Sequence, residues 1–126
     1  MKIIMLTGPA QSGKTTTLNL LYDKITDKGS KNILACKSVL GNPVVNDFKC
    51  VVSYKDKKVA IYTMGDYYKA MIEAIIEFAN CDVLVLAYNN HFVAKLDEFT
   101  GSFQHHRVIQ KTGSNGNDVE AILSEI

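Results

Sequence analysis

Two glycines, a lysine and a threonine near the start of the chain have the spacing of a phosphate-binding loop. Gly8, Gly13, Lys14 and Thr15 satisfy the pattern G-x-x-x-x-G-K-[ST]. Glycines let the backbone wrap so that successive amide N–H groups point toward one anion, and a helix that starts directly after them adds partial positive charge. The lysine can reach the outer phosphates, and the threonine hydroxyl can ligate Mg²⁺. The segment therefore predicts a site for a phosphorylated ligand with magnesium.

The residues on both sides of this motif are typical of a bend between a buried strand and a helix. Lys2 to Thr7 is a short apolar run closed by Gly-Pro, as in a strand covered on both faces, and it ends too soon for a secretory signal. From Thr15 onward apolar residues recur at helical spacing, and Gly29 stands where a helix would end. The motif is thus expected at the carboxyl end of a strand, where open α/β sheets bind ligands.

Through this motif, the Walker A motif, the sequence resembles the P-loop NTPase superfamily. The resemblance covers Gly8 to Thr15 and, beyond them, only the order of strands and helices. It implies that Lys14 stabilises charge on the transferring phosphoryl group and that Thr15 holds Mg²⁺. Thr16 is expected either to contact an α-phosphate or to face solvent in the first turn. The residues expected to bind the nucleotide are Gly8, Pro9, Ala10, Gln11, Ser12, Gly13, Lys14, Thr15, Thr16 and Gly65.

The acidic residue that usually accompanies such a loop departs from the pattern here. In Ras-like GTPases a buried strand ends in an aspartate, and a glycine and a glutamine follow shortly after. Placing Gly65 on that glycine puts Tyr62 at the aspartate position and Asp66 at the glutamine position. Asp66 is therefore expected to hold the water shell of the metal or to orient the attacking water. The alternative is that Asp66 only caps the helix that begins at Tyr67.

The segments expected to contact the base favour ATP over GTP. Ras-like proteins read guanine with N-K-x-D after a central strand. The corresponding segment here, Asn89 to Phe92, keeps one asparagine and lacks both the lysine and the aspartate. ATP follows by elimination. The end of the last strand, Gln110 to Gly113, is expected either to wall the base or to be an ordinary solvated loop.

Strands and helices alternate along the rest of the chain. Further strands are expected at 32–36, 48–54, 58–63, 82–88 and 107–111, and further helices at 67–79, around 92–99 and at the C-terminal end with Asn117 as a cap. The charged run at 55–58 indicates a hairpin. We therefore expect one domain over residues 1–126 with an α/β fold. The resemblance makes it a P-loop NTPase-type three-layer sandwich, with a mostly parallel sheet, helices on both faces and an antiparallel edge hairpin.

The composition limits the partners and the compartment. A net charge of +1 gives no electrostatic reason to expect nucleic acid or a membrane. Arg107 is the only arginine, which disfavours the arginine-rich lid of small kinases, and its place at the start of a late strand suggests a surface role. Cys36, Cys50 and Cys81 form no C-x-x-C pair. They are expected to be buried free thiols in a cytoplasmic protein.

The expected function is binding of an Mg²⁺–nucleoside triphosphate complex, ATP rather than GTP, with slow hydrolysis. Lys14 and Asp66 are the candidate catalytic residues, and Thr15 and Asp66 the candidate metal ligands. One alternative is a nucleotide or small-molecule kinase with its acceptor in the connection at 37–47. Another is a nucleotide-dependent switch without significant turnover, in which that connection and residues 65–66 change their affinity for a protein partner. A third is an anion-binding relic.

Overall fold

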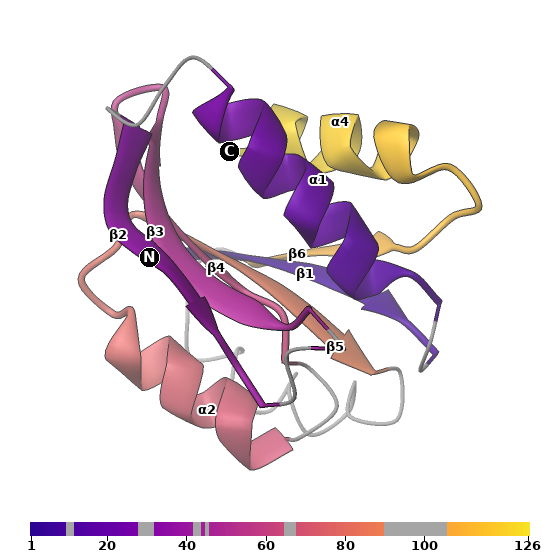
Figure 1. The fold of residues 1–126 in the computed structure, drawn as a ribbon, viewed down its shortest axis with the longest axis horizontal. Helices are drawn as coiled ribbons and strands as arrows, with labels where there is room; N and C mark the ends of the chain where they lie inside the picture. Colours follow the sequence, from indigo (N-terminus) through magenta and orange to yellow (C-terminus); the bar gives the residue numbers. More distant parts are fainter. Residues whose placement is uncertain (10–11, 28–31, 42–43, 45, 65–67, 90–105) are drawn as a thin grey trace.

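The computed structural model describes residues 1–9, 12–27, 32–41, 44, 46–64, 68–89 and 106–126, and for Cys36, Tyr68 and His106 it describes the backbone alone. Within these ranges the elements follow one another in the order shown in Figure 1. They are β1 (Lys2–Gly8), α1 (Lys14–Thr26), β2 (Ile33–Val39), β3 (Phe48–Tyr54), β4 (Lys57–Tyr62), α2 (Tyr68–Glu77), β5 (Val83–Asn89), β6 (His106–Gln110) and α4 (Asn115–Glu125).

The described strands form one mixed sheet in the order β2-β3-β4-β5-β1-β6. The pairs β4–β5, β5–β1 and β1–β6 are parallel, whereas β2–β3 and β3–β4 are antiparallel. The prediction of a mostly parallel P-loop-type sandwich is therefore wrong. The hairpin predicted at 55–58 is confirmed by the antiparallel β3–β4 pair, but β2 rather than the hairpin forms the edge of the sheet. Two short connections explain the difference, because parallel neighbours need a long crossover. Lys55 and Asp56 turn tightly with positive φ, and Leu40 N donates to Asp47 O to close the loop between β2 and β3.

Helices lie on both faces of this sheet. Figure 1 shows α1 and α4 on one face and α2 on the other. Alternate residues of β1 divide between two apolar clusters: Ile4 and Leu6 pack with α1 and α4, and Ile3 and Met5 pack with α2. Because both faces are covered, the interior residues of β1 and every residue of β5 are buried. This accounts for the continuous apolar runs in the sequence.

The last helix is capped by a different residue from the predicted one. Ser114, rather than Asn117, is the N-cap of α4, and its Oγ accepts a hydrogen bond from Asn117 N at 3.3 Å. Serine is a strong cap that satisfies the free N–H two to three residues ahead. The strand predicted at 32–36 also continues to Val39. The helix predicted around 92–99 lies outside the described residues.

Two of the three cysteines match the prediction of buried free thiols. Cys50 and Cys81 are both buried and unbonded, whereas the side chain of Cys36 is outside the described part. Burial raises the pKa of Cys50 to about 12 and also raises that of Cys81. Both thiols are therefore held in the neutral form.

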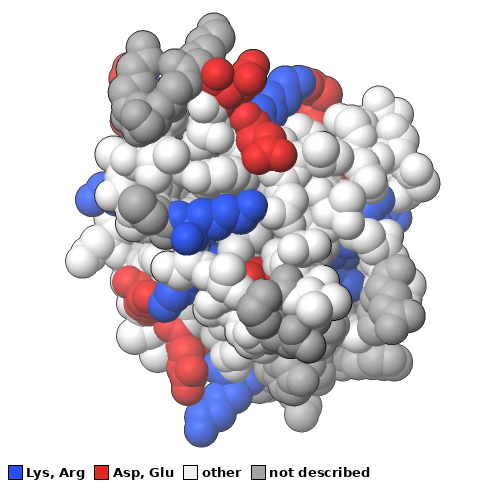
Figure 2. Space-filling model, viewed as in Figure 1, with Lys and Arg blue, Asp and Glu red and all other residues white. Residues whose placement is uncertain are grey.

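Charge is distributed without a large patch on the face shown in Figure 2. Acidic and basic side chains alternate over that face among the residues coloured there. In the helices that the structure describes, no stretch is long and apolar enough to cross a membrane.

Candidate phosphate-binding site

The motif lies between the end of β1 and the start of α1. Gly13 is the N-cap of α1 and has a φ of +93°. Glycine adopts this left-handed conformation at little cost, which explains its place directly before the helix. The first turn of α1 therefore begins at Lys14, at the carboxyl end of the parallel strands β1 and β5. Ala10 and Gln11 lie outside the described residues.

The loop folds closely over Gly8. A Cβ atom on Gly8 would lie 2.8 Å from Ser12 Oγ and 3.1 Å from Lys111 Cβ, so a side chain has no room there. Ser12 Oγ is buried and has no hydrogen-bond partner among the residues that the structure describes. A buried hydroxyl without a partner is rare in proteins. This one can donate to an anion that enters the loop.

The Lys14 ammonium is held within the loop by backbone oxygen atoms. Lys14 Nζ donates to Gly8 O at 3.0 Å and to Pro9 O at 2.7 Å, and the residue is only 7% exposed. Lysine is seldom buried to this extent. Its position on the first turn of α1 places a positive charge where the helix N-terminus also favours an anion.

The Thr15 hydroxyl is hydrogen-bonded to Asp47, which lies just before β3. Thr15 Oγ1 donates to Asp47 Oδ1 at 3.0 Å, and Thr63 Oγ1 donates to the same oxygen atom at 2.8 Å. Asp47 directly precedes β3, and β3 runs antiparallel to β4. The start of β3 therefore lies beside the end of β4, at the same sheet edge as the loop.

Backbone hydrogen bonds fix this arrangement. Phe48 N donates to Thr63 Oγ1 at 2.9 Å, and Thr63 N donates to Phe48 O at 3.1 Å. The Thr63 hydroxyl thus accepts from the backbone and donates to Asp47. Because Phe48 and Thr63 are both buried, this pair holds the neighbouring carboxylate in place.

On the other side, the loop contacts a buried ion pair between β6 and α4. Lys111 Nζ lies 2.8 Å from Asp118 Oδ2, and both side chains are 3% exposed. Thr112 donates to Asp118 through its backbone N–H and its hydroxyl. Burial opposes ionisation of Asp118, but the hydrogen bonds from Lys111 and Thr112 outweigh it and lower the pKa of the carboxyl.

The same ion pair positions a side chain against the loop. The stem of Lys111 borders both glycines of the motif, since a Cβ on Gly8 or Gly13 would meet it at 3.1 Å or 3.5 Å. Thr17 in α1 also donates to Asn115 Oδ1 at 3.2 Å. The sequence predicted that the segment at 110–113 either walls a base or is a solvated loop. The structure shows that the buried side chain of Lys111 in this segment packs against Gly8 and Gly13.

The structure assembles only part of the predicted site. It brings together Gly8, Pro9, Ser12, Gly13, Lys14 and Thr15. Thr16 is exposed, as the solvent-facing alternative expects. Gly65 and Asp66 lie outside the described residues. Asp47 was missed as a site residue, and the signal for it was its place directly before a strand that pairs antiparallel with β4.

The available donors suit magnesium better than a transition metal. In the described ranges no three His, Cys, Asp or Glu side chains gather in a metal-binding group. The Thr15 hydroxyl and the Asp47 carboxylate are hard oxygen donors. Mg²⁺ prefers such donors and is usually held by one or two protein groups together with substrate phosphates and water.

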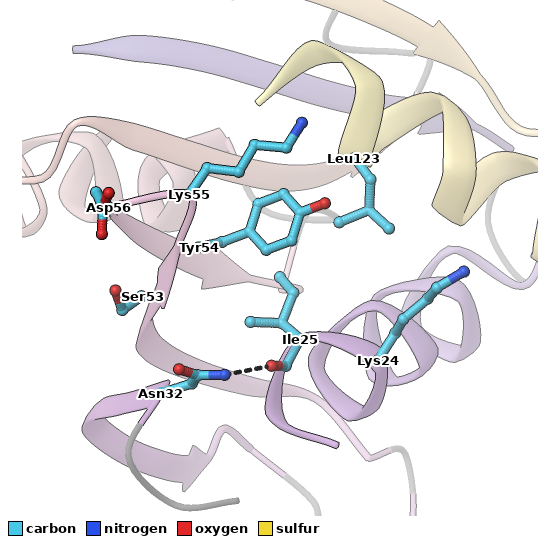
Figure 3. Close-up of a pocket in the computed structure, with 8 residues that line it drawn as sticks. All are labelled: Lys24, Ile25, Asn32, Ser53, Tyr54, Lys55, Asp56 and Leu123. Atoms are coloured by element: carbon cyan, nitrogen blue, oxygen red, sulfur yellow. Dashed lines mark hydrogen bonds between the residues drawn. The ribbon is translucent and has the colours of Figure 1, made fainter. Parts of the chain in front are cut away.

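A separate surface cavity of about 410 Å³ lies at the opposite end of α1, as Figure 3 shows. Its lining residues are Lys24, Ile25, Asn32, Ser53, Tyr54, Lys55, Asp56 and Leu123. Several of its polar groups already have partners within the protein. Lys24 pairs with Glu120, Asn32 Nδ2 donates to Ile25 O at 2.9 Å, and the Lys55 ammonium lies 5.2 Å from the centre of the Tyr54 ring. The cavity therefore presents fewer convergent groups to a ligand than the loop does.

No protein-family model, curated protein or solved structure matches this chain. The chemistry of the loop and its neighbours is thus the basis for a function.

Proposed function

We propose that this protein binds the Mg²⁺ complex of a nucleoside triphosphate, with the phosphates in the loop from Gly8 to Thr15. The observation that carries the proposal is the placement of Lys14. Its ammonium is buried at the start of α1 and donates to the carbonyl groups of Gly8 and Pro9. A phosphate oxygen carries negative charge and therefore attracts an ammonium more strongly than a neutral carbonyl oxygen does.

Three further features support a phosphate ligand. The N-terminus of α1 follows a left-handed glycine and carries partial positive charge. Ser12 Oγ is a buried hydroxyl without a hydrogen-bond partner in the described part of the chain. Thr15 Oγ1 lies beside the Asp47 carboxylate, and these two groups together supply oxygen donors for magnesium. Bound Mg²⁺ would neutralise charge on the phosphates.

ATP is the proposed nucleotide, and slow hydrolysis is the proposed reaction. ATP is favoured because the segment at 89–92 lacks the residues that read guanine. In hydrolysis a water oxygen forms a bond to the γ-phosphorus while the bond from that phosphorus to the β–γ bridging oxygen breaks. ADP leaves, and a proton is released to solvent. Lys14 stabilises the charge on the transferring group. We place this activity in the cytoplasm, where free thiols stay reduced.

A nucleotide-dependent switch is the second candidate, and one observation favours it. The Asp47 carboxylate accepts a hydrogen bond from the Thr15 hydroxyl in the loop. The backbone oxygen of Asp47 also accepts a hydrogen bond from Leu40 N, which closes the β2–β3 connection. A ligand that changes the contact of Thr15 therefore acts on this connection. Amide hydrogen exchange at residues 40, 41 and 46–48, faster or slower with ATP and Mg²⁺ while no phosphate is released, would distinguish the switch from the hydrolase.

Calorimetry with ATP and GTP, each with and without Mg²⁺, tests the proposed binding. We expect ATP to bind, Mg²⁺ to strengthen binding, and GTP to bind more weakly. Lys14→Ala should lower ATP affinity by roughly thirtyfold, the equivalent of about 2 kcal/mol for a lost hydrogen bond to a charged group. Phosphate release should disappear in the same variant.

Lys24→Ala is the matched control. Lys24 lies on the same helix but at its other end, where it is exposed and paired with Glu120. This variant should bind ATP as the wild type does. Absence of ATP binding at about millimolar concentration, or equal losses in both variants, would contradict the proposal.

A further inference from the structure

Asp47 is a partly buried carboxylate without a positively charged partner among the described residues. Its two side-chain hydrogen bonds come from the hydroxyls of Thr15 and Thr63, and both reach Oδ1. Within the same ranges no group donates to Oδ2. Since a carboxylate can accept about four hydrogen bonds, Asp47 retains the capacity to face a cation or a water bound to one.

The location of Asp47 matters because the residues that the structure describes at the end of β4, up to Met64, include no acidic one. β4 ends in Tyr62, and Thr63 follows it. The β3–β4 register pairs Lys49 with Tyr62, so Asp47 lies just beyond the last paired residues, next to the end of β4. A carboxylate therefore reaches this edge from the start of β3.

The charge of Asp47 makes binding of a bare phosphate unfavourable. Asp47 accepts a hydrogen bond from Thr15 in the first turn of α1. Lys14, which is in the same turn, is the group proposed to hold phosphate. Two anions at such neighbouring positions repel each other. A divalent cation near both anions makes their proximity favourable, because the carboxylate and the phosphate are each attracted to the cation.

We infer that Asp47 is the carboxylate that faces the magnesium ion beside Thr15, in the role that the sequence suggested for Asp66. This inference rests on the proposed function, since it requires a triphosphate in the loop. Thr63 is a positioning residue: its hydroxyl accepts from Phe48 N and donates to Asp47, which orients the carboxylate. Asp47 thereby makes nucleotide binding depend on magnesium.

The test is calorimetry of ATP binding to the wild type and to Asp47→Asn, each with Mg²⁺ and with a chelator. The asparagine Oδ1 can still accept from both hydroxyls, so the fold should be retained. Without Mg²⁺ the variant should bind ATP more tightly than the wild type, because a like charge is gone. With Mg²⁺ it should bind more weakly, and the enhancement by Mg²⁺ should fall by about tenfold. A purely structural role would not change the two affinities in opposite directions.

Two variants serve as controls, and a third replaces Asp47→Asn if it does not fold. Asp56→Asn makes the same chemical change in the β3–β4 turn, where the φ of +61° also suits asparagine, and should leave both affinities unchanged. Asp66→Asn tests the rival carboxylate and should keep the full enhancement by Mg²⁺. Asp47→Ser retains a short oxygen acceptor. Like Asp47→Asn, it should bind ATP more tightly than the wild type without Mg²⁺ and more weakly with Mg²⁺.

The outcomes separate this inference from the proposed function. If the wild type binds ATP with an Mg²⁺ enhancement that Asp47→Asn keeps in full, or that Asp66→Asn loses instead, the role of Asp47 is overturned and the proposed function stands. If the wild type binds no ATP in either condition, the proposed function fails and this inference fails with it.

Discussion

The loop from Gly8 to Thr15 has an aspartate on each side, and the two differ in how their charge is met. On the β6–α4 side, Asp118 pairs with Lys111 and also accepts hydrogen bonds from Thr112, with almost no exposure to solvent. On the β3–β4 side, Asp47 is partly buried and accepts from the hydroxyls of Thr15 and Thr63.

This difference separates a structural carboxylate from one available to a ligand. A buried charge is tolerated when a partner charge and hydrogen bonds replace the lost water. Asp118 meets both conditions, and its pair with Lys111 holds the lysine stem against Gly8 and Gly13. Asp47 has hydrogen bonds but no cation among the described residues. Its charge is therefore available to a metal ion.

Breaking the pair on the β6–α4 side should have the largest effect on stability. Asp118→Asn leaves the Lys111 ammonium buried without its partner and should lower the free energy of unfolding by about 3–5 kcal/mol. Asp47→Asn should change it by about 1 kcal/mol or less, because its hydroxyl donors keep an acceptor. Urea denaturation of both variants measures the difference. Equal losses would show that the two carboxylates are not distinct.

The pH dependence of stability sharpens the same contrast. Asp118 has a folded-state pKa below its ordinary value of 3.8. It therefore stabilises the fold above pH 3.8, and this contribution is lost as the pH falls through the lower, folded-state pKa. In urea denaturation from about pH 5 downward, the wild type should lose more stability than Asp118→Asn. Parallel curves for the two proteins would refute this origin.

The smallest effect concerns Ser12 and has opposite signs for stability and binding. Ser12→Ala removes a buried hydroxyl that has no hydrogen-bond partner within the described ranges, so the nucleotide-free protein should become more stable by up to about 1 kcal/mol. ATP affinity should fall several-fold, because the hydroxyl no longer donates to phosphate. Thermal unfolding and calorimetry measure the two effects. A loss of stability would indicate that the hydroxyl already has a structural partner.

The strand, the bend and the helix that contain the motif could be predicted from the sequence because their signals are local. The spacing of Gly13, Lys14 and Thr15 requires only that a strand precede them and a helix follow. Gly13 does adopt a left-handed conformation directly before α1. In the same way, the run from Phe48 to Tyr54 is long and apolar enough to be recognised as a strand from its own residues.

The surroundings of the loop could not be predicted because they depend on strand order. Alternating strands and helices suggested a mostly parallel sheet, but two short connections make β2 and β3 antiparallel to their neighbours. That pairing brings Asp47 to Thr15 across 32 positions of sequence. Lys111 and Asp118 are close in sequence, yet their burial depends on the packing of α4 and β6 beside the loop.

The most direct test of the central claim is a titration with ATP and Mg²⁺ followed by amide NMR signals. We predict that the signals of Gly13, Lys14, Thr15 and Asp47 shift as the nucleotide saturates the protein, whereas those of Tyr54 and Lys55 at the cavity of Figure 3 stay in place. Shifts confined to the cavity, or no shifts at saturating nucleotide, would contradict the assignment of the loop as the nucleotide site.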